Sequence, residues 1–452
     1  MAGDELFGEL PEQAKPQADT APFEKPRLRE PKRDQIELRP VDIESLIGED
    51  HLARMIWAFV LRLDLSELEN RIKARGSNPG APTITPRLML ALWIYATSQG
   101  IGSARLLARL CESDNAYRWL CGGVSVNYHT LSTFRNGCAG LLDRLLIDHL
   151  TALAEAGLID LDTLAQDGVK IRASAGTASF RRAETLEQKK ALAQAVVEEL
   201  KCEVEADPEA SSKRVQAAKE RAARERAERL EEAQAALAQL QQKRQELQDK
   251  GGNGKKPKEP RGSTTDADAR IMKMADAGFR PAYNVQVASV AGEQIVVAVD
   301  VTSNGSDGGL MRPMLEQVQA QIGRFPKRHI VDGGFTSLDD IEWAHGQGTE
   351  VFCPPKKPKK NADPYKVRPT DGPGTSAWRG RMGSEEGKAQ YEIRVICECI
   401  HARWRIWNLR QVTVRGLEKV RAVVLLYAFT NNVLQGYRLV QESYLLATAK
   451  AA

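Results

Sequence analysis

Apolar residues recur every three to four positions from Arg39 to about Gly157, which predicts a succession of helices. One of them is marked by Thr85 as its N-cap and by Pro86 in its first turn, ahead of a long apolar stretch. Further helices are predicted over Ser103–Cys111 and Gly140–Ala156. We therefore expect a small all-helical domain in this part of the chain.

From Asp160 onward, short runs rich in β-branched residues alternate with stretches of helical periodicity. The predicted strands are Thr163–Ile171, Tyr283–Val290, Gln294–Val301, Arg328–Val331 and Glu350–Cys353. The predicted helices are Leu310–Ile322, Leu338–Gly346, Tyr391–Arg405 and Leu417–Leu434. This alternation predicts the α/β class, with a mostly covered mixed sheet flanked by helices.

A long charged insertion separates the first two predicted strands. Its arms, Glu184–Ala206 and Glu209–Lys250, are expected to pair as an antiparallel helical hairpin that projects by up to ~60 Å. The seam is predicted to contain Ala193, Val196, Leu200 and Val204 in one arm and Leu230, Ala233, Leu237 and Leu240 in the other. Two interpretations stay open: a coiled-coil arm that contacts a partner or second subunit, and a self-contained insert. A mobile basic connector is predicted over 251–258.

Composition narrows the class of protein. The chain has 452 residues, enough for about three domains of ~150 residues. Its 64 basic and 60 acidic residues leave a net charge of +4, which excludes a uniformly basic nucleic-acid coat. With 42% hydrophobic residues, wholesale disorder is excluded as well. The proline-rich start, Met1–Asp34, predicts a flexible tail without a secretory signal.

The lengths of the apolar stretches and the pattern of cysteines indicate the cellular compartment of the protein. The longest apolar stretches, Leu88–Ala96 and Val423–Phe429, are far shorter than the ~20 residues that span a bilayer, so no membrane segment is expected. Seven cysteines without a CxxC pair favour reduced, buried thiols over a zinc site. We expect a cytoplasmic protein.

Three acidic residues stand where an α/β fold could bring them together. Asp167 and Asp332 lie at the ends of predicted strands, and Glu398 lies in a predicted helix. If the two strands are neighbours, their axes lie ~4.8 Å apart, close enough for shared cations. Two Mg²⁺ ions held there could activate a hydroxyl and stabilise the leaving oxygen of a phosphodiester. The alternatives are ordinary Asp-Gly turns and a solvated helical glutamate.

The surroundings of Glu398 carry a specific signature. Tyr391, Arg394 and Glu398 have the spacing i, i+3 and i+7, which would place them on one helical face, and Arg405 follows after seven residues. This pattern resembles the Tyr-Arg-Glu-Lys signature of bacterial insertion-sequence transposases of the DDE class, except that Arg405 replaces the usual lysine. Similar segments include 38–40, 266–270, 278–284, 414–421, Tyr427 and 431–432.

The resemblance implies an RNase H-like catalytic core in which Asp167, Asp332 and Glu398 form the catalytic, metal-binding triad. It implies Mg²⁺, for which Mn²⁺ can substitute, as the cofactor. The implied activity is cleavage at the ends of the element, followed by joining of the 3′-hydroxyl to target DNA. The implied partners are double-stranded DNA, carrying terminal inverted repeats or target sequence, and a second copy of the chain. The implied location is the cytoplasm, in association with the nucleoid.

The charge distribution points to DNA independently. Between His401 and Arg421 six basic residues stand against Glu418 alone, a local charge of +5. The predicted DNA contacts are Tyr391, Arg394, Arg403, Arg405, Arg410, Arg415 and Lys419. Trp404 and Trp407 are interpreted either as stacking platforms for bases or as core residues. Residues 356–360, with four lysines, are either a backbone contact or a solubilising loop.

In the N-terminal helices, Asn127–Arg135 is predicted to begin a helix that reads DNA, with His129 and Arg135 as contacts. The alternative is that His129 caps a helix or fills a loop.

The predicted organisation is a tail over 1–38, a helical N-terminal DNA-binding domain over 39–157 and a catalytic core split into 158–182 and 263–436. The hairpin and linker occupy 183–262, and a C-terminal tail occupies 437–452. The leading hypothesis is a DDE transposase. The alternatives are a catalytically inactive, transposase-derived DNA-binding protein and a scaffold that acts through the hairpin.

Overall fold

The structure is a computed structural model that describes residues 40, 42–72, 82–206, 213–249, 259–356 and 363–451. The predicted tail over 1–38, the connector 251–258, the segment 38–39 and four of the residues at 356–360 therefore lie outside the described residues. No described helix combines the length and apolarity needed to cross a membrane.

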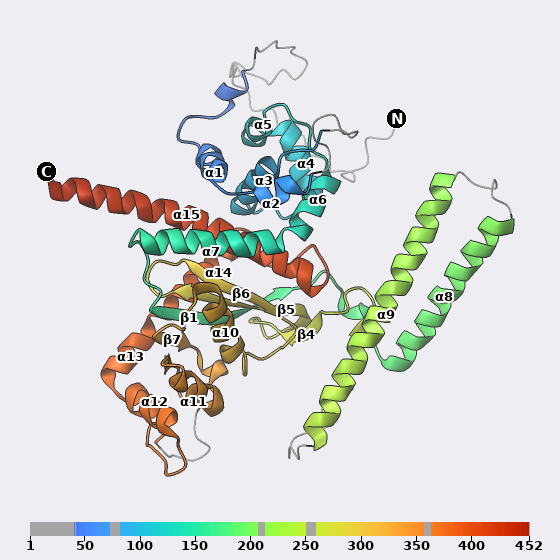
Figure 1. Ribbon diagram of the computed structural model, residues 1–452. Helices are drawn as coiled ribbons and strands as arrows, with labels where there is room; N and C mark the ends of the chain where they lie inside the picture. Colours follow the sequence, from blue (N-terminus) through green and yellow to red (C-terminus); the bar gives the residue numbers. More distant parts are fainter. Residues whose placement is uncertain are drawn as a thin grey trace, which may run out of the picture. The chain divides into compact units, whose positions relative to one another are not determined.

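The N-terminal part is helical, as predicted. Its helices are α1 (Leu52–Leu61), α2 (Ser66–Asn70), α3 (Pro86–Ser98), α4 (Ala104–Ser113), α5 (Asn115–Cys121), α6 (Tyr128–Gly137) and α7 (Ala139–Glu155). Residues 88–96 of α3 are buried on every side, because that helix runs through the middle of the others (Figure 1). Pro86 stands in its first turn after Thr85, whose side chain makes no capping hydrogen bond.

A mixed β-sheet forms the second part and confirms the predicted α/β class. Its strands are β1 (Thr163–Arg172), β4 (Arg270–Lys273), β5 (Phe279–Val290), β6 (Val296–Thr302), β7 (Arg328–Val331) and β8 (Glu350–Phe352). The order is β4-β5-β1-β7-β8, and β6 also pairs with β5. The central strand β1 runs antiparallel to β5 and parallel to β7. The strands expected to carry the two aspartates are thus neighbours.

Helices surround this sheet: α10 (Met311–Ile322), α11 (Leu338–Gly346), α12 (Pro373–Gly383), α13 (Glu385–Glu392), α14 (Val395–Ile406) and α15 (Leu417–Ala451). Helix α14 packs on β1 and β5, whereas α10 packs on β6. The helix predicted over 417–434 continues to residue 451. The single helix predicted over 391–405 is wrong, because turns at Ile393 and Arg394 separate α13 from α14.

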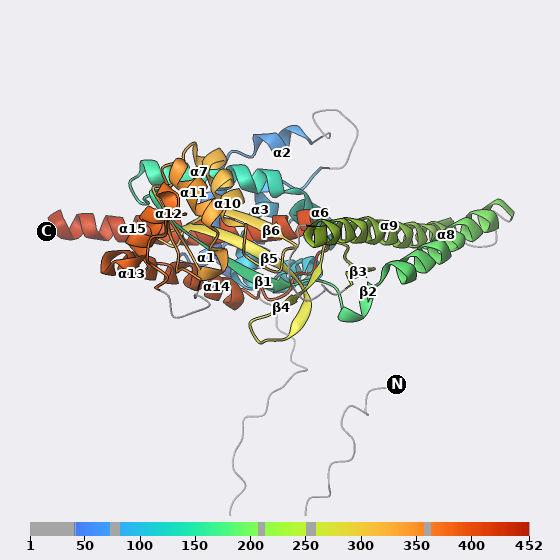
Figure 2. The ribbon, with the colours of Figure 1, turned by 90° about the horizontal axis from the view of Figure 1, so that it is seen from below.

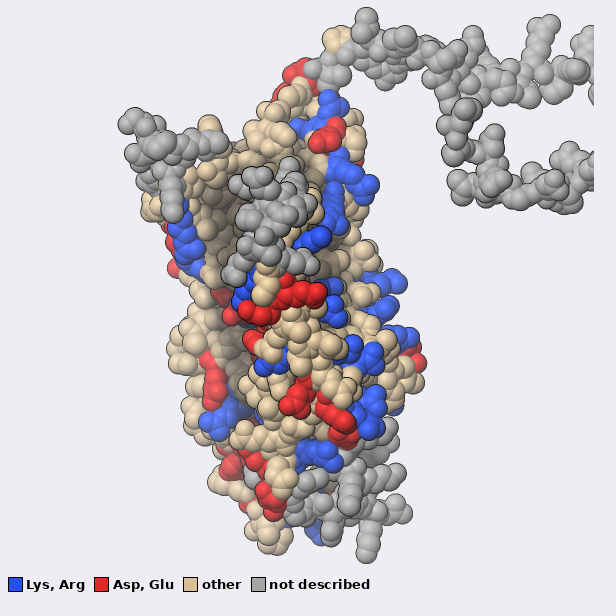
Figure 3. Space-filling view, turned by 90° about the vertical axis from the view of Figure 1, so that its right-hand side faces the viewer, with Lys and Arg blue, Asp and Glu red and all other residues tan. Residues whose placement is uncertain are grey.

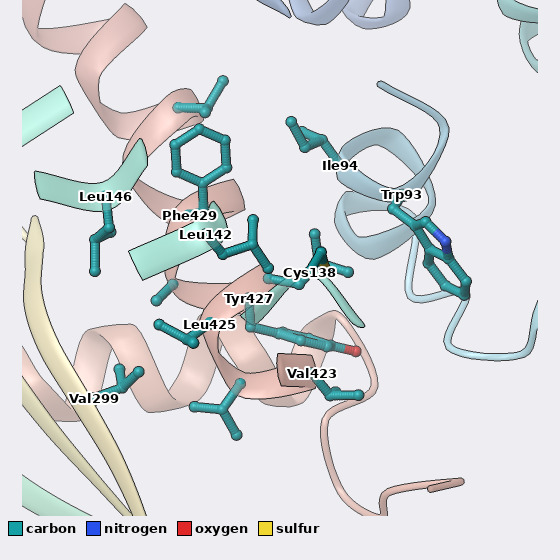
Figure 4. Packing of buried hydrophobic residues seen from close by; sticks show 14 of the residues in the cluster. Trp93, Ile94, Cys138, Leu142, Leu146, Val299, Val423, Leu425, Tyr427 and Phe429 are labelled. Atoms are coloured by element: carbon teal, nitrogen blue, oxygen red, sulfur yellow. The ribbon is translucent and has the colours of Figure 1, made fainter. Parts of the chain in front are cut away.

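Helix α15 joins the two parts through one hydrophobic core. Phe429 of α15 belongs to a buried cluster that also contains Ile94 of α3, Leu142 of α7 and Val299 of β6 (Figure 4). All four of these residues are 0% exposed. Burial of such large apolar groups is the main favourable contribution to folding. The N-terminal helices and the sheet are therefore held together by shared packing.

The insertion forms the predicted hairpin of α8 (Ala183–Ala206) and α9 (Lys213–Asp249) (Figures 1 and 2). It leaves and rejoins the body at β2 (Phe180–Arg181) and β3 (Gly262–Ser263), which pair with each other. Its buried seam contains Leu186, Ala193, Leu230, Ala233 and Leu237. The expectation for Val196 is wrong, because its side chain is 45% exposed. The side chain of Val204 lies outside the described residues.

All seven cysteines are free thiols. Five are buried, as expected, but Cys202 and Cys399 are exposed because they lie on outward faces of α8 and α14.

Candidate active site

The register of β1 and β7 brings two acidic residues side by side. Gln166 of β1 is paired with Val331 of β7, so Asp167 and Asp332 are the next residues along two adjacent parallel strands. Asp332 also caps the short 3₁₀ turn at Gly333–Phe335, where its Oδ1 accepts a hydrogen bond of 2.6 Å from the Gly334 amide. Asp332 therefore does form an Asp-Gly turn, which was the alternative interpretation of this residue. The pairing of β1 with β7 places the same residue beside Asp167.

Arg394 links Asp167 to the third acidic residue. Its guanidinium lies 2.8 Å from Glu398 Oε1 and 3.5 Å from Asp167 Oδ2. Tyr391, near the end of α13, is half-buried and interacts with Arg394. The helix break changes the predicted arrangement, since the three residues of the signature lie around a bend between two helices. The structure nevertheless brings Arg394, and Glu398 through it, to Asp167, which is 227 positions away from Arg394 in the sequence.

Burial and charge perturb the groups around Asp167. Burial raises the pKa of Asp167 from 3.8 to about 6, and the charges of Asp332 and Asp307 act in the same direction. The Gly168 amide and Arg394 oppose this rise. Burial also tends to lower the pKa of Arg394, but the neighbouring Tyr391 and the three carboxylates raise it overall. Arg394 is therefore a permanent positive charge among acidic groups.

His401 is a neighbour of Asp167 that the sequence reasoning missed. It lies one turn after Glu398 on α14, is 6% exposed, and places Nδ1 3.8 Å from Asp167 Oδ2. Burial, followed by the charges of Arg405 and Arg394, lowers its pKa to about 4, so the imidazole is neutral at physiological pH. A lone histidine in an amphipathic helix gave no signal of this placement.

A buried network of polar side chains supports the strand that carries Asp167. Gln166 donates to Gln286 Oε1 at 2.9 Å and shares a 3.0 Å hydrogen bond with His329 Nε2. Gln286 in turn donates to Asp307 Oδ1 at 2.9 Å, as does Asn284 at 2.7 Å. The sequence signal was present, since Gln166, Asn284 and Gln286 stand among mostly apolar residues of β1 and β5. Such amides are kept inside a core only when they are hydrogen-bonded.

The three carboxylates of Asp167, Asp332 and Glu398 suit a hard divalent cation. In this structure two of them form ion pairs with Arg394 instead. Three carboxylates supply the oxygen ligands that Mg²⁺ and Mn²⁺ prefer. Among the described residues, however, no group of three His, Cys, Asp or Glu side chains stands close enough to hold a metal ion. Two of the three carboxylates instead face Arg394. The chemistry of the residues fits the metal, and Arg394 lies between two of the carboxylates.

The basic segment after α14 divides into surface and interior residues. Arg405, Arg410, Arg415 and Lys419 are exposed. Arg403 is half-buried and donates to Asn431 Oδ1 at 2.7 Å and to Gln294 Oε1 at 2.6 Å. Figure 3 shows the side of the molecule on which the α8–α9 hairpin lies in Figure 1, and there Lys and Arg are interspersed with Asp and Glu. Exposed residues are thus the ones in a position to meet DNA phosphates.

The stacking interpretation of the two tryptophans is wrong. Trp404 is 1% exposed and Trp407 is 8% exposed, because both pack in the core beside Tyr427 of α15. No base can stack on a ring that is enclosed by protein.

The two predicted contacts of the N-terminal helices have different surroundings. His129 is exposed in the first turn of α6, and Asn127 caps that helix by accepting from the Thr130 amide. Arg135 is 5% exposed, donates to Gly102 O at 2.6 Å and lies over the ring of Trp93. The expectation that Arg135 contacts DNA is therefore wrong in this structure: its guanidinium holds helices together.

Comparisons with known proteins agree with the geometry. Residues 41–137 match a family model described as "Transposase domain (DUF772)", and residues 259–433 match one described as "Transposase DDE domain". Together the two matches cover more than half of the chain. The second match includes Asp332 and Glu398, whereas Asp167 lies between the two matches. No curated protein and no solved structure matches the chain significantly.

Proposed function

Because the chain belongs to the DDE transposases of insertion sequences, with an α/β fold of the RNase H-like type, we propose that it cleaves the ends of its own element and joins the freed 3′-hydroxyl to target DNA. The observation that carries this proposal is the adjacency of Asp167 on β1 and Asp332, the residue directly after β7, with Glu398 linked to Asp167 through Arg394.

Both proposed steps are displacements at phosphorus. In hydrolysis a water oxygen attacks phosphorus and the bond to the 3′-oxygen breaks, which leaves a 3′-hydroxyl and a 5′-phosphate. In strand transfer that hydroxyl attacks a phosphorus of the target strand, and the target's own 3′-oxygen leaves as a hydroxyl. Each step forms one phosphorus–oxygen bond and breaks one, so positioning and charge neutralisation carry the catalysis.

Asp167, Asp332 and Glu398 would hold Mg²⁺, or Mn²⁺ in its place. Bound divalent cations supply charge neutralisation at the phosphate and a more acidic attacking water. The chain's own residues orient the carboxylates: the Gly334 amide holds Asp332, and the Gly168 amide donates to Asp167 Oδ1 at 2.8 Å. These contacts support a preorganised pair of oxygen ligands, one on β1 and one directly after β7.

We propose a DNA-contact surface made of Tyr391, Arg394, Arg405, Arg410, Arg415 and Lys419, with His129 on α6 as a further contact. The exposed guanidinium and ammonium groups of Arg405, Arg410, Arg415 and Lys419 suit phosphate oxygens, whereas Tyr391 and Arg394 are half-buried beside the acidic residues. Arg403 lies at the margin of this surface, where its guanidinium donates to Asn431 and Gln294. A transposase must hold two DNA ends together, which supports a homodimer. We also keep the domain limits 39–157, 158–182 with 263–436, and 183–262 as a proposal.

The proposed reaction is tested by incubating the purified protein with supercoiled plasmid that carries the ends of its own element. We expect nicking in the presence of Mg²⁺ and none after Asp167→Asn. The matched control is Asp339→Asn, an exposed aspartate in the first turn of α11, which should retain wild-type activity. Nicking by Asp167→Asn at the wild-type rate would overturn the triad assignment.

The DNA around the coding region gives a second check. We expect terminal inverted repeats on both sides of it. Their absence around every genomic copy, together with no nicking by the wild-type protein, would support a catalytically inactive, transposase-derived DNA-binding protein instead.

A further inference from the structure

One guanidinium occupies the space between the acidic residues of the site. Arg394 is paired with Glu398 at 2.8 Å and with Asp167 at 3.5 Å, and Asp332 lies within range of its charge. Its side chain is 22% exposed, compared with 16% for Asp167. The cation that these carboxylates share in this structure is therefore an arginine side chain that solvent can reach.

The backbone at Arg394 explains how the side chain reaches two carboxylates at once. Arg394 is the N-cap of α14, and hydrogen bonds of the i→i+3 type surround it, from its own amide to Tyr391 O and from the Cys397 amide to Arg394 O. In one continuous helix Arg394 and Glu398 would still be neighbours, but the bend between α13 and α14 also directs Arg394 toward β1.

We propose that Arg394 is the resident counter-cation of the acidic site in the DNA-free protein, and that a DNA phosphate draws it away when DNA binds. DNA and a divalent cation then bind with positive cooperativity. This inference rests on the proposed function, because it takes Asp167, Asp332 and Glu398 to be the metal-binding residues and Arg394 to be a DNA contact.

Two properties of the Arg394 guanidinium would link the binding of DNA to that of the cation: its limited number of N–H donors and its positive charge. A guanidinium that donates to two carboxylates cannot donate to a phosphate with the same N–H groups, and its positive charge repels a divalent cation among the same oxygens. When a phosphate takes over the guanidinium, both effects are removed. Thermodynamic linkage then requires that DNA raise the affinity for the cation by the same factor by which the cation raises the affinity for DNA.

The first measurement titrates Mn²⁺ into the DNA-free protein and follows free Mn²⁺ by electron paramagnetic resonance. We expect Arg394→Gln to bind Mn²⁺ about tenfold more tightly than the wild type, within the usual range of coupling between sites. Arg394→Lys keeps the charge and should stay near the wild-type affinity. The matched control is Arg438→Gln, which removes an arginine from an exposed i,i+4 pair on α15 and should change nothing.

The second measurement uses fluorescence anisotropy of a labelled element-end duplex, with and without Ca²⁺ at constant ionic strength. The wild type should bind DNA several-fold more tightly with Ca²⁺, and Arg394→Gln should lose this enhancement. Equal Mn²⁺ affinities of wild type and Arg394→Gln would overturn the inference, as would an unchanged Ca²⁺ effect in the variant.

The variant Asp167→Asn distinguishes failure of the proposed metal site from failure of the counter-cation role of Arg394. If it abolishes Mn²⁺ binding while Arg394→Gln behaves as the wild type, only the counter-cation inference fails. If Asp167→Asn binds Mn²⁺ as well as the wild type, the proposed metal site itself is wrong, and the inference fails with it.

Discussion

His401 Nδ1 lies 3.8 Å from Asp167 Oδ2, and both side chains are largely enclosed by α14 and the sheet. Burial favours the uncharged form of each, since it raises the pKa of Asp167 to about 6 and lowers that of His401 to about 4. Keeping Asp167 ionised in the folded protein therefore lowers the free energy of unfolding, and this loss should depend on pH.

We predict that Asp167→Asn stabilises the DNA-free protein at pH 8. The folded-state pKa of Asp167 lies above the ordinary 3.8, so between those values the folded state binds more protons and stability falls as pH rises. A shift from 3.8 to about 6 corresponds to at most about 3 kcal/mol. Thermal unfolding from pH 4 to pH 8 should show a gap that opens as pH rises and closes near pH 4. A gap that widens toward low pH would contradict it, and Asp339→Asn should show none.

We predict that Gly168→Ala damages the fold around Asp167. A Cβ at this position would lie 2.4 Å from Asp307 Oδ1 and 2.5 Å from Gln286 Nε2, so the buried network would have to shift. The melting temperature and plasmid nicking should both fall. The control is Gly140→Ala in α7, where no atom lies within 4 Å of the new Cβ and helix propensity favours alanine by up to ~1 kcal/mol. Equal behaviour of the two variants would show that the network is not rigid.

We predict that Trp404→Ala destabilises the protein by about 3–5 kcal/mol, the usual cost of emptying a buried aromatic site. Urea unfolding gives this value. The variant that remains folded should keep the wild-type affinity for DNA, because the ring is 1% exposed. Ile406→Ala, two positions later and 80% exposed, should change stability little. Selective loss of DNA affinity at unchanged stability would restore the stacking interpretation.

We predict that Arg410→Ala weakens binding to all DNA sequences. The plot of log K for DNA binding against the logarithm of the salt concentration should become less steep by about one unit, the value for one phosphate contact. Arg410 is exposed in the segment between α14 and α15. Arg421→Ala serves as the control, because Arg421 already forms a double hydrogen bond to Asp143 at 2.6 and 2.8 Å. That variant should keep the wild-type slope. Equal slopes in wild type and Arg410→Ala would remove Arg410 from the proposed surface.

We predict that the hairpin mediates self-association. Leu192 and Val196 on α8 are 67% and 45% exposed, an apolar surface that the two arms do not cover themselves. Arg181 and Gly262 are paired across β2 and β3, so a short Gly-Ser linker can replace residues 182–261. Light scattering after size exclusion should show a dimer for the wild type and a monomer for this deletion.

A double variant, Leu192→Glu with Val196→Glu, keeps the hairpin and should also be a monomer. The proposed active site should remain folded in this variant and in the deletion. Deletion or charge variants that remain dimeric would favour the self-contained insert.

Local periodicity was enough to predict most of the secondary structure. Arg328–Val331 and Leu338–Gly346 have the predicted bounds, because short β-branched runs and capped amphipathic stretches depend on neighbouring residues. The break before Val395 was not predictable in the same way. Residues 391–405 have helical periodicity throughout, and the bend lies just before the chain passes from the cluster that contains Cys397 to the cluster that contains Ile400 and Trp404.

Burial of charged and aromatic residues likewise depended on distant partners. Arg135 reads as a surface residue of an amphipathic helix, yet Gly102 and Trp93 enclose it. Trp404 and Trp407 lie between basic residues, yet α15 covers them. Sequence patterns report which residues are polar, whereas enclosure depends on elements that meet only after folding.

The sequence by itself determined the α/β class, the helical hairpin, the acidic residues and the basic character of the segment after Glu398, because these follow from local patterns and composition. The tertiary structure decided that Asp167 and Asp332 stand on adjacent strands, that Arg394 lies between Asp167 and Glu398, and that His401 faces the same carboxylate. These relationships join residues that are mostly far apart in the chain. They arise from strand register and helix packing, which only the assembled core defines.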